Sequence, residues 1–333
     1  SVSERRKLAQ FPKISVENIK NGTFMSGFES YAKDQFPLRE QFRALKTAFS
    51  LYVLVQSDQH GLYSKEGYIA KMEYPLHADS LQYATACFGE VYERYLSGTY
   101  TDVYLTIVPD KSYFLADEND YPSMDYDVLA EQVRDGMEYA QYIDIFGDLQ
   151  ISDYYHTDAH WRQEQITDVV RHLAGAMGVE LTQQYETKEL EKPFYGVYYG
   201  QLALPVKPDT LYYLDNDMLD HCTVYDYEDH AENKIYDLTK TEGNDLYEIF
   251  LGGSKSLLSI ENPNAKTDRE LVMFRDSFGS SIAPLLADGY AKITLVDIRY
   301  LPVERIGNYI NFKDQDVLFL YSTSVLNHSE TLK

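Results

Sequence analysis

The run ELVMFRDSFGSSIAPLLA, residues 270–287, joins two apolar segments through a short polar turn. Its first part, Glu270 to Phe274, is typical of a strand buried on both faces. Its last part, Ser280 to Ala287, predicts a short helix. The turn between them therefore lies at the carboxyl edge of a predicted sheet, which is where open α/β folds keep their binding sites.

Short apolar strands and amphipathic helices alternate along most of the chain around this run. This alternation predicts a mostly parallel sheet whose two faces are covered by helices. Further strands are expected at 103–108, 142–146, 292–298 and 316–321, and further helices at 79–96, 127–140 and 166–177.

Two parts of the chain depart from the alternation. Residues 1–60 combine a polar start with amphipathic runs, which predicts a linker and N-terminal helices. Residues 61–333 are expected to form the α/β domain. Within it, residues 180–250 are rich in Tyr, Asp and Glu and weakly periodic, which indicates an inserted lobe.

The composition limits the possible partners and cofactors. The 333 residues include 53 Asp and Glu against 30 Lys and Arg, a net charge of −23, so nucleic acid and anionic membrane surfaces are not expected partners. Cys87 and Cys222 are the only cysteines, and two thiols make neither a disulfide framework nor a zinc site. No apolar stretch reaches the roughly 18 residues that span a bilayer. We expect no metal and no cofactor.

Ser277 is the candidate nucleophile, because a serine in such a turn is placed for acyl transfer. Backbone N–H groups of Ser277 and of the first helical turn are expected to point outward, where they would stabilise negative charge on a carbonyl oxygen. The competing interpretation is structural, since Asp276 and Ser277 are also residues that cap helices.

His160 is the candidate base and Asp158 the acid that orients it. A serine hydroxyl needs a base to remove its proton, and that base must be held in one tautomer. Asp158 is two residues from His160, so in a turn its carboxylate can reach Nδ1 and free Nε2 for the serine. Trp161 is a candidate wall of the site. The alternative is a polar surface pair beside a core tryptophan.

Several other residues are weaker candidates. His156 alternates with Asp158 and His160, which leaves a metal site open as an alternative. Lys111 is either an ion-paired loop residue or a substrate contact. For the remaining candidates structural pairing is the favoured interpretation, and binding of an oxyanion or a sugar hydroxyl is the alternative; they are Arg275, Arg299 and Tyr300.

Taken together, Asp158-x-His160-Trp161 and the distant Asp276-Ser277-Phe278 resemble the DHHW family and its relatives, the alginate O-acetylation proteins of the AlgJ and AlgX type. Those proteins are SGNH-hydrolase-like, with the Asp-x-His element placed before the serine in a circularly permuted order. The resemblance covers nearly the whole chain. It also includes residues 21–24, 34–39, 108–111, 142–144, 252–253 and 296–300.

Three departures from the family pattern concern the site. Ala159 stands where the family name motif has its first histidine. Arg275 stands where many SGNH enzymes have a glycine. The asparagine that completes their oxyanion hole has no clear match, and the candidates after the last strand are Ser322, Thr323 and Asn327.

The resemblance implies an SGNH-like three-layer α/β/α fold and a serine acyltransferase or esterase with a Ser-His-Asp triad. It implies action on O-acetyl groups of a cell-surface polysaccharide, and it allows for a membrane partner that donates the acyl group. It also implies an extracytoplasmic protein, anchored through a segment ahead of Ser1. The alternative is a non-catalytic cell-surface protein that binds glycan through the Tyr-rich insertion; tyrosine, with 31 residues, suits sugar-binding grooves.

Overall fold

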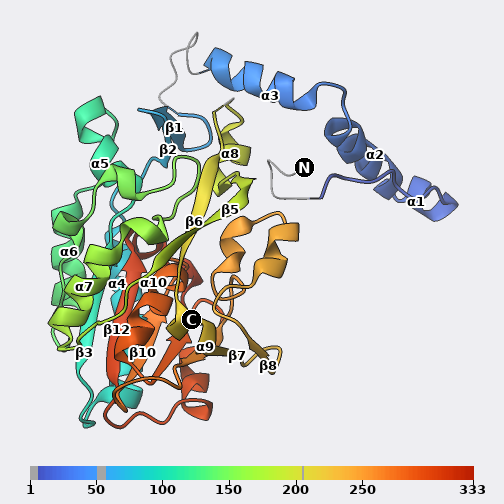
Figure 1. Ribbon diagram of the computed structural model, residues 1–333. Coiled ribbons are helices and arrows are strands. Elements are labelled where there is room, and N and C mark those ends of the chain that lie inside the picture. The colour runs from blue at the N-terminus through green and yellow to red at the C-terminus, as the bar shows by residue number, and fades with distance from the viewer. Residues whose placement is uncertain (1–6, 51–57, 205) are drawn as a thin grey trace.

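A sheet of eight strands runs through the middle of the molecule (Figure 1). The structure, a computed structural model, describes residues 7–50, 58–204 and 206–333. In spatial order the strands of the sheet are β4 (Gln141–Tyr142), β3 (Val103–Val108), β12 (Asp316–Ser322), β10 (Glu270–Arg275), β11 (Lys292–Val296), β9 (Leu257–Glu261), β7 (Thr223–Asp226) and β8 (Ala231–Asn233).

The sheet is mostly parallel, as the alternation of strands and helices predicts. The five strands from β4 to β11 pair parallel, whereas β9, β7 and β8 each pair antiparallel with the strand before them in the sheet. Only β9 and β8 therefore run against the other strands of this sheet. The carboxyl ends of β3, β12, β10 and β11 meet at one edge, because Ser322 is opposite Val108 and Phe274 is opposite Val296.

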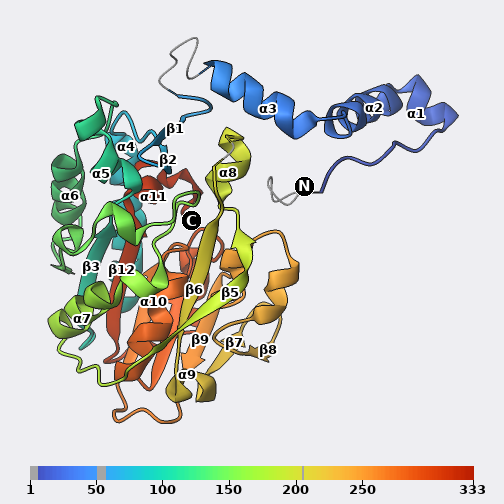
Figure 2. The ribbon, with the colours of Figure 1, turned by 45° about the horizontal axis from the view of Figure 1, so that its top comes forward.

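Helices cover both faces of the sheet, which confirms the predicted α/β/α layers (Figures 1 and 2). One face packs on α7 (Thr167–Ala176) and α10 (Gly279–Leu286), and the other on α4 (Ala78–Val91) and α6 (Tyr126–Asp135). Successive side chains of a strand point to opposite faces, so both layers draw on the same strands. All seven residues of β12 are buried for this reason.

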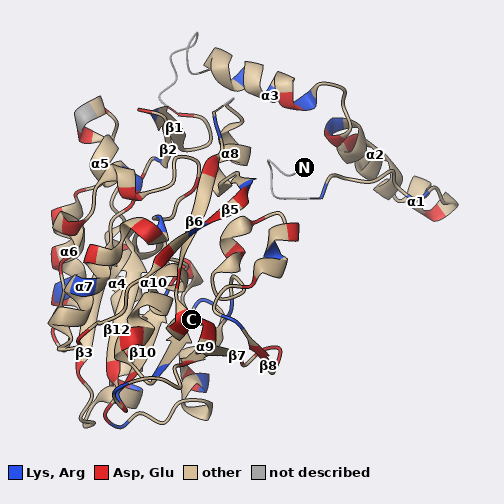
Figure 3. Ribbon diagram, in the orientation of Figure 1, with Lys and Arg blue, Asp and Glu red and all other residues tan. Residues whose placement is uncertain are grey.

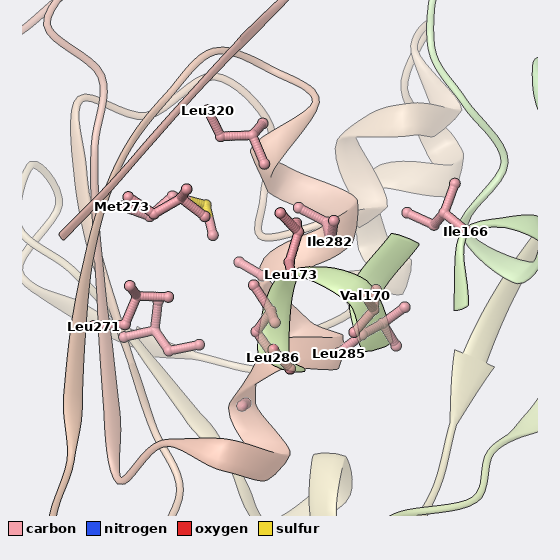
Figure 4. Packing of buried hydrophobic residues seen from close by; sticks show 14 of the residues in the cluster. Ile166, Val170, Leu173, Leu271, Met273, Ile282, Leu285, Leu286 and Leu320 are labelled. Atoms are coloured by element: carbon pink, nitrogen blue, oxygen red, sulfur yellow. The ribbon is translucent and has the colours of Figure 1, made fainter. Parts of the chain in front are cut away.

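The layer formed by α7 and α10 follows from the spacing of their apolar residues. Val169, Val170 and Leu173 recur on one side of α7 and are all buried. Figure 4 shows Leu173 beside Ile282 of α10 and across from Met273 of β10. This contact fixes α10 against the sheet, and with it the turn that precedes α10.

Three helices lie to one side of the sheet domain, α1 (Val16–Lys20), α2 (Thr23–Asp34) and α3 (Arg39–Ala48) (Figure 2). Arg43 of α3 donates to the carbonyl of Gly200 at 2.6 Å, which ties this arm to the rest of the chain. Residues 1–6 and 51–57 of the predicted N-terminal segment lie outside the described residues. The division of the chain near residue 60 stays a prediction.

Two small hairpins complete the structure near the carboxyl edge of the sheet. Residues 62–71 form the first hairpin, and a second one is formed by two strands from the predicted insertion. The rest of that insertion supplies β7 and β8 to the main sheet. The other strands and α-helices of the described chain are β1 (Leu62–Lys65), β2 (Tyr68–Lys71), β5 (Glu186–Phe194), β6 (Asp209–Asp215), α5 (Lys111–Leu115), α8 (Val197–Leu202), α9 (Asp217–His221) and α11 (Thr323–Asn327).

The predicted strand at 142–146 is wrong beyond its first residue. Only Gln141 and Tyr142 pair with β3, at the outer edge of the sheet. The side chain of Asp144 accepts a hydrogen bond from the amide of Phe146, which turns the chain away from the sheet into a short helical turn. β9 has no counterpart among the expected strands.

The structure shows where the acidic residues lie and the state of the two cysteines. Asp and Glu are spread over many elements, among them α6 and the β7–β8 hairpin (Figure 3). Cys87 and Cys222 are both free. Among the described helices, none combines the length and the apolar character that crossing a bilayer requires.

We expect Leu173→Ala to lower the free energy of unfolding by about 2–5 kcal/mol, because it leaves a cavity between α7, α10 and the sheet. Leu238→Ala is the matched control, since Leu238 is 47% exposed and its truncation should change stability by less than about 0.5 kcal/mol. Urea denaturation of both variants measures the difference. Equal losses in the two variants would contradict the assigned core.

Candidate active site

Ser277 lies in the turn between β10 and α10, and the neighbouring Asp276 holds that turn in place. Asp276 is fully buried; its Oδ1 accepts from the amide of Phe278 at 3.0 Å, and its Oδ2 accepts from the amide of Ser322 at 2.8 Å. Asp276 therefore stabilises the turn before α10 and also ties this turn to the end of β12. The hydroxyl of Ser277 faces His160 instead.

The segment that carries Asp158 and His160 is a tight hairpin. Tyr154 and Trp161 pair across it, and the amide of Tyr155 donates to the carbonyl of His160 at 3.1 Å. Residues 156–159 form its tip. The hairpin thus brings Asp158 and His160 to the edge of the sheet where β10 ends, 117 residues before Ser277.

Ser277, His160 and Asp158 form one hydrogen-bonded chain. His160 Nε2 is 2.7 Å from Ser277 Oγ, and its Nδ1 is 2.6 Å from Asp158 Oδ1. Asp158 is fully buried, and its carboxylate also accepts from the amides of His160 (3.1 Å) and Val197 (2.7 Å). A carboxylate facing Nδ1 favours the tautomer with hydrogen on that nitrogen, which leaves Nε2 as the acceptor for the serine proton.

Aromatic rings fix the orientation of the His160 ring. Tyr247 stacks on it with centroids 3.9 Å apart and planes 10° apart, and Phe278 lies at 5.0 Å. Trp161 is fully buried, packs edge-on against Phe278 and donates its indole N–H to Ser281 Oγ at 2.8 Å. It supports the site from within the core and does not form an exposed wall.

Lys111 holds the hairpin through hydrogen bonds to its backbone. Its side chain is buried, and Nζ donates to the carbonyls of Tyr155 at 2.9 Å and His156 at 3.2 Å. The ammonium also lies 5.2 Å from the ring centre of Tyr198. Lys111 is therefore neither a surface ion pair nor an exposed substrate contact.

Two further contacts hold the tip from the sides. Asp209 at the start of β6 accepts from the amide and hydroxyl of Thr157 at 2.8 and 2.6 Å. Gly196 donates its amide to Thr157 Oγ1 at 2.9 Å. The backbone of Gly196 approaches so closely that a β-carbon there would stand 2.3 Å from the carbonyl carbon of Thr157 and 2.4 Å from the amide of Asp158. Only glycine fits at this position.

Arg275 is the last residue of β10, and Arg299 and Tyr300 follow the end of β11 at the same edge of the sheet. Burial lowers the pKa of Arg275, whose aliphatic stem packs against Gly279 and whose Nη1 donates to the carbonyl of Asp276 at 3.3 Å. Arg299 forms a two-point ion pair with Asp297 at 2.9 and 2.6 Å. Tyr300 is 50% exposed. Both arginines are thus engaged within the protein, and neither forms a hydrogen bond with Ser277 in the described structure.

The candidate residues after β12 also form hydrogen bonds within the protein. Ser322 Oγ accepts from the amide of Val325 and so caps α11. Thr323 Oγ1 donates to Asp110 at 2.7 Å, and Asn327 holds the amide of His77 at 2.7 Å. The hydroxyl of Thr323 and the side-chain amide of Asn327, which donates to the carbonyl of Pro75 at 3.0 Å, are therefore not free as oxyanion donors.

The start of α10 offers fewer free amides than expected. The amide of Phe278 is taken by Asp276 Oδ1, and the amide of Gly279 donates to the carbonyl of Asp276 at 3.2 Å. Within the part of the chain that the structure describes, the amide of Ser277 has no acceptor. Ser277 N–H is therefore the backbone donor that remains for a substrate oxygen.

His156, Asp158 and His160 do not converge on a metal position. His156 turns to Asp209, at 3.1 Å, while His160 turns to Ser277. Over residues 7–50, 58–204 and 206–333 no group of three or more His, Cys, Asp or Glu residues is arranged to hold a metal ion.

Sequence reasoning missed three contributors to the site. Asp209 and Tyr247 come from the weakly periodic insertion, and no local pattern marks either one. Gly196 resembles an ordinary turn glycine in the sequence. Only the close approach of the hairpin tip to these residues reveals what they do.

Residues 145–296 match the family model described as DHHW protein, which confirms the resemblance. The fold is similar to a DHHW family protein from Eubacterium siraeum (21% identity, TM-score 0.63, covering 82% of this chain and 95% of that one) and to Bacillus cereus PatB1 (16%, 0.61, 80% and 96%). It is also similar to the O-acetyltransferase domain of Pseudomonas putida AlgJ (13%, 0.50, 80% and 92%). A search of curated proteins finds no match.

We expect Gly196→Ala to destabilise the protein by about 1–3 kcal/mol, because the new methyl group overlaps the backbone of Thr157 and Asp158. Gly175→Ala is the matched control. A β-carbon at this position in α7 meets nothing within 4 Å, so alanine should raise the free energy of unfolding by about 0.5–1 kcal/mol. Thermal unfolding of the two variants tests the close approach. A neutral Gly196→Ala would refute it.

Burial lowers the pKa of Lys111 to about 7, although nearby Asp158 and Asp209 favour the charged form. Above pH 7 the unfolded chain therefore binds one more proton than the folded chain, so the cost of burying this lysine falls as the pH rises. Relative to Lys111→Met, the wild type should gain about 2 kcal/mol of stability between pH 7 and 9. Urea denaturation measures both proteins at both pH values. If the difference in unfolding free energy between them is the same at pH 7 and pH 9, the lowered pKa of Lys111 is contradicted.

Proposed function

We propose that the chain is an extracytoplasmic SGNH-type serine acyltransferase or esterase that acts on O-acetyl groups of a cell-surface polysaccharide. The observation that carries this proposal is the position of the His160 ring, with one nitrogen 2.7 Å from Ser277 Oγ and the other 2.6 Å from Asp158. These contacts lie within the hydrogen-bonding reach that nucleophilic catalysis requires.

In this mechanism Ser277 Oγ attacks the carbonyl carbon of an acetyl ester while His160 Nε2 takes the hydroxyl proton. Asp158 stabilises the imidazolium that forms. The oxyanion of the tetrahedral intermediate is held by the free amide of Ser277. His160 then gives its proton to the leaving oxygen, and an acetyl-serine remains.

A second half-reaction releases the acetyl group. A sugar hydroxyl or a water molecule attacks the acetyl-serine, His160 accepts the proton of that nucleophile, and the proton returns to Ser277 Oγ as the bond breaks. A sugar as acceptor makes the enzyme a transferase, and water makes it an esterase. A membrane partner that donates the acyl group is part of the transferase version of this proposal.

Two of the similar structures support this class of chemistry. One is an O-acetyltransferase domain, and a second structure of PatB1, 14% identical with a TM-score of 0.58, carries a sulfonyl adduct. Both likenesses are of fold, so the substrate and the location outside the cytoplasm are proposals for this chain.

A sulfonyl fluoride tests the nucleophile. We expect one label per chain at Ser277, no label in Ser277→Ala, and labelling slowed by about 10³–10⁴-fold in Asp158→Asn, where the histidine tautomer is no longer fixed. Ser97→Ala, which changes an exposed serine, is the control. Labelling and release of chromophore from an acetyl ester, with and without an oligosaccharide acceptor, are measured on the same samples.

The absence of labelling in a folded wild type would reject the serine mechanism. It would favour the alternative, a non-catalytic glycan-binding protein of the same fold. Faster acetyl release in the presence of the oligosaccharide identifies a transferase, whereas release that does not depend on it identifies an esterase.

A further inference from the structure

The hairpin that carries Asp158 and His160 also carries His156, whose imidazole has a carboxylate partner of its own in Asp209 of β6. Asp209 Oδ1 accepts from the amide of His156 at 2.8 Å and is 3.1 Å from His156 Nδ1. The ring of His156 stacks on Tyr68 with centroids 4.2 Å apart and planes 10° apart. The imidazole is thus held in place, although 48% of its side chain is exposed.

This second pair faces a pocket that the proposed acyl chemistry does not use. The pocket has a volume of about 530 Å³, within the usual range for ligand sites. It is bordered by the hairpin, by the β1–β2 turn and by residues 206–212. Its lining includes Gly67, His156, Arg162, Lys207, Asp209 and Tyr212.

Hydrogen bonds decide which atoms of the pair are free for a ligand. Burial alone would raise the pKa of Asp209, but hydrogen bonds from His156 and Thr157 outweigh it and hold the pKa below its ordinary value. Asp209 is therefore ionised, and the hydrogen of His156 belongs on Nδ1. Nε2 has no partner among the described residues and is left as an acceptor for a hydroxyl group.

A carboxylate also holds Arg162, as Asp209 holds His156. Its Nε donates to Glu164 Oε1 at 2.8 Å, its Nη2 lies 2.7 Å from the same oxygen, and the Glu164 side chain is only 7% exposed. Nη1 has no partner in the described part of the chain. The guanidinium lies 6.0 Å from the ring centre of Tyr212, which presents a flat phenol beside these polar groups.

The lining combines an acceptor nitrogen, two cationic donors and an aromatic face. In a chain with a net charge of −23, Arg162 and Lys207 place two positive charges at this pocket, and these charges reduce the repulsion of an acidic ligand. The carboxylate of Asp209 is already occupied by its own hydrogen bonds. A ligand with several hydroxyl groups and a flat apolar side matches this set of partners.

We propose that this pocket binds a saccharide segment, with hydroxyl groups on His156 Nε2 and Arg162 Nη1 and a sugar face on Tyr212. Only Thr157 separates His156 from Asp158, so one hairpin supplies residues to both the pocket and the triad. It is then a subsite for the polysaccharide that receives or loses the acetyl group. The role of the bound sugar as the group that is acetylated or deacetylated rests on the proposed function, whereas sugar binding itself does not.

Binding is measured directly, without turnover, in the full chain carrying Ser277→Ala. Isothermal titration with chitotetraose, cellotetraose and tetragalacturonate separates amino sugar, neutral and acidic ligands. At least one tetrasaccharide should bind, and adding His156→Ala or Tyr212→Ala should weaken that binding by about tenfold or more. Tyr100→Ala is the matched control, because Tyr100 is 93% exposed and away from the pocket.

Sulfonyl labelling of the same pocket variants with Ser277 intact separates the two proposals. Unchanged labelling with weakened sugar binding supports both of them. Weakened sugar binding without any wild-type labelling keeps the pocket and rejects the serine mechanism. If no tetrasaccharide binds at millimolar concentration, or if both pocket variants bind as tightly as the Tyr100→Ala control, the pocket proposal is overturned.

Discussion

Three buried carboxylates hold the edge of the sheet where the site lies. Asp276 fixes the serine turn, Asp158 fixes His160, and Asp209 fixes the hairpin tip, each by accepting hydrogen bonds from backbone amides. A buried charge is tolerated only when such donors surround it, because an unpaired one costs several kcal/mol. The turn and the hairpin therefore have few alternative conformations, and the distance between Ser277 and His160 follows from this constraint.

The sheet brings these locally ordered segments together at one site. β3, β12, β10 and β11 end at the same edge, so loops from distant parts of the sequence meet there. Lys111, which follows β3, reaches under the hairpin, and Asp276, which follows β10, bonds to the end of β12. The burial of apolar side chains between α7, α10 and the sheet holds these ends together, as Figure 4 shows for Leu173 and Ile282.

The hairpin that carries His156 and His160 has two functional sides in our proposals. His160 faces the serine, and His156 faces the neighbouring pocket; each imidazole has a carboxylate near Nδ1. Acyl transfer needs both a reactive serine and a held acceptor, since an acceptor fixed near the acyl group competes better with water. One rigid loop that borders both regions would meet this requirement without large movements.

The sequence by itself determined the layered α/β fold, the strand-to-helix turn at Ser277 and the identity of the Asp158–His160 element, because periodicity, turns and close spacing are local properties. It did not determine the end of the strand at Tyr142, where the Asp144 side chain turns the chain, nor the engagement of Arg275 and Arg299 within the protein. Only the tertiary structure decided the roles of Lys111, Gly196, Asp209 and Tyr247. Their contacts join segments tens of residues apart, and no local pattern records which distant backbone will approach them.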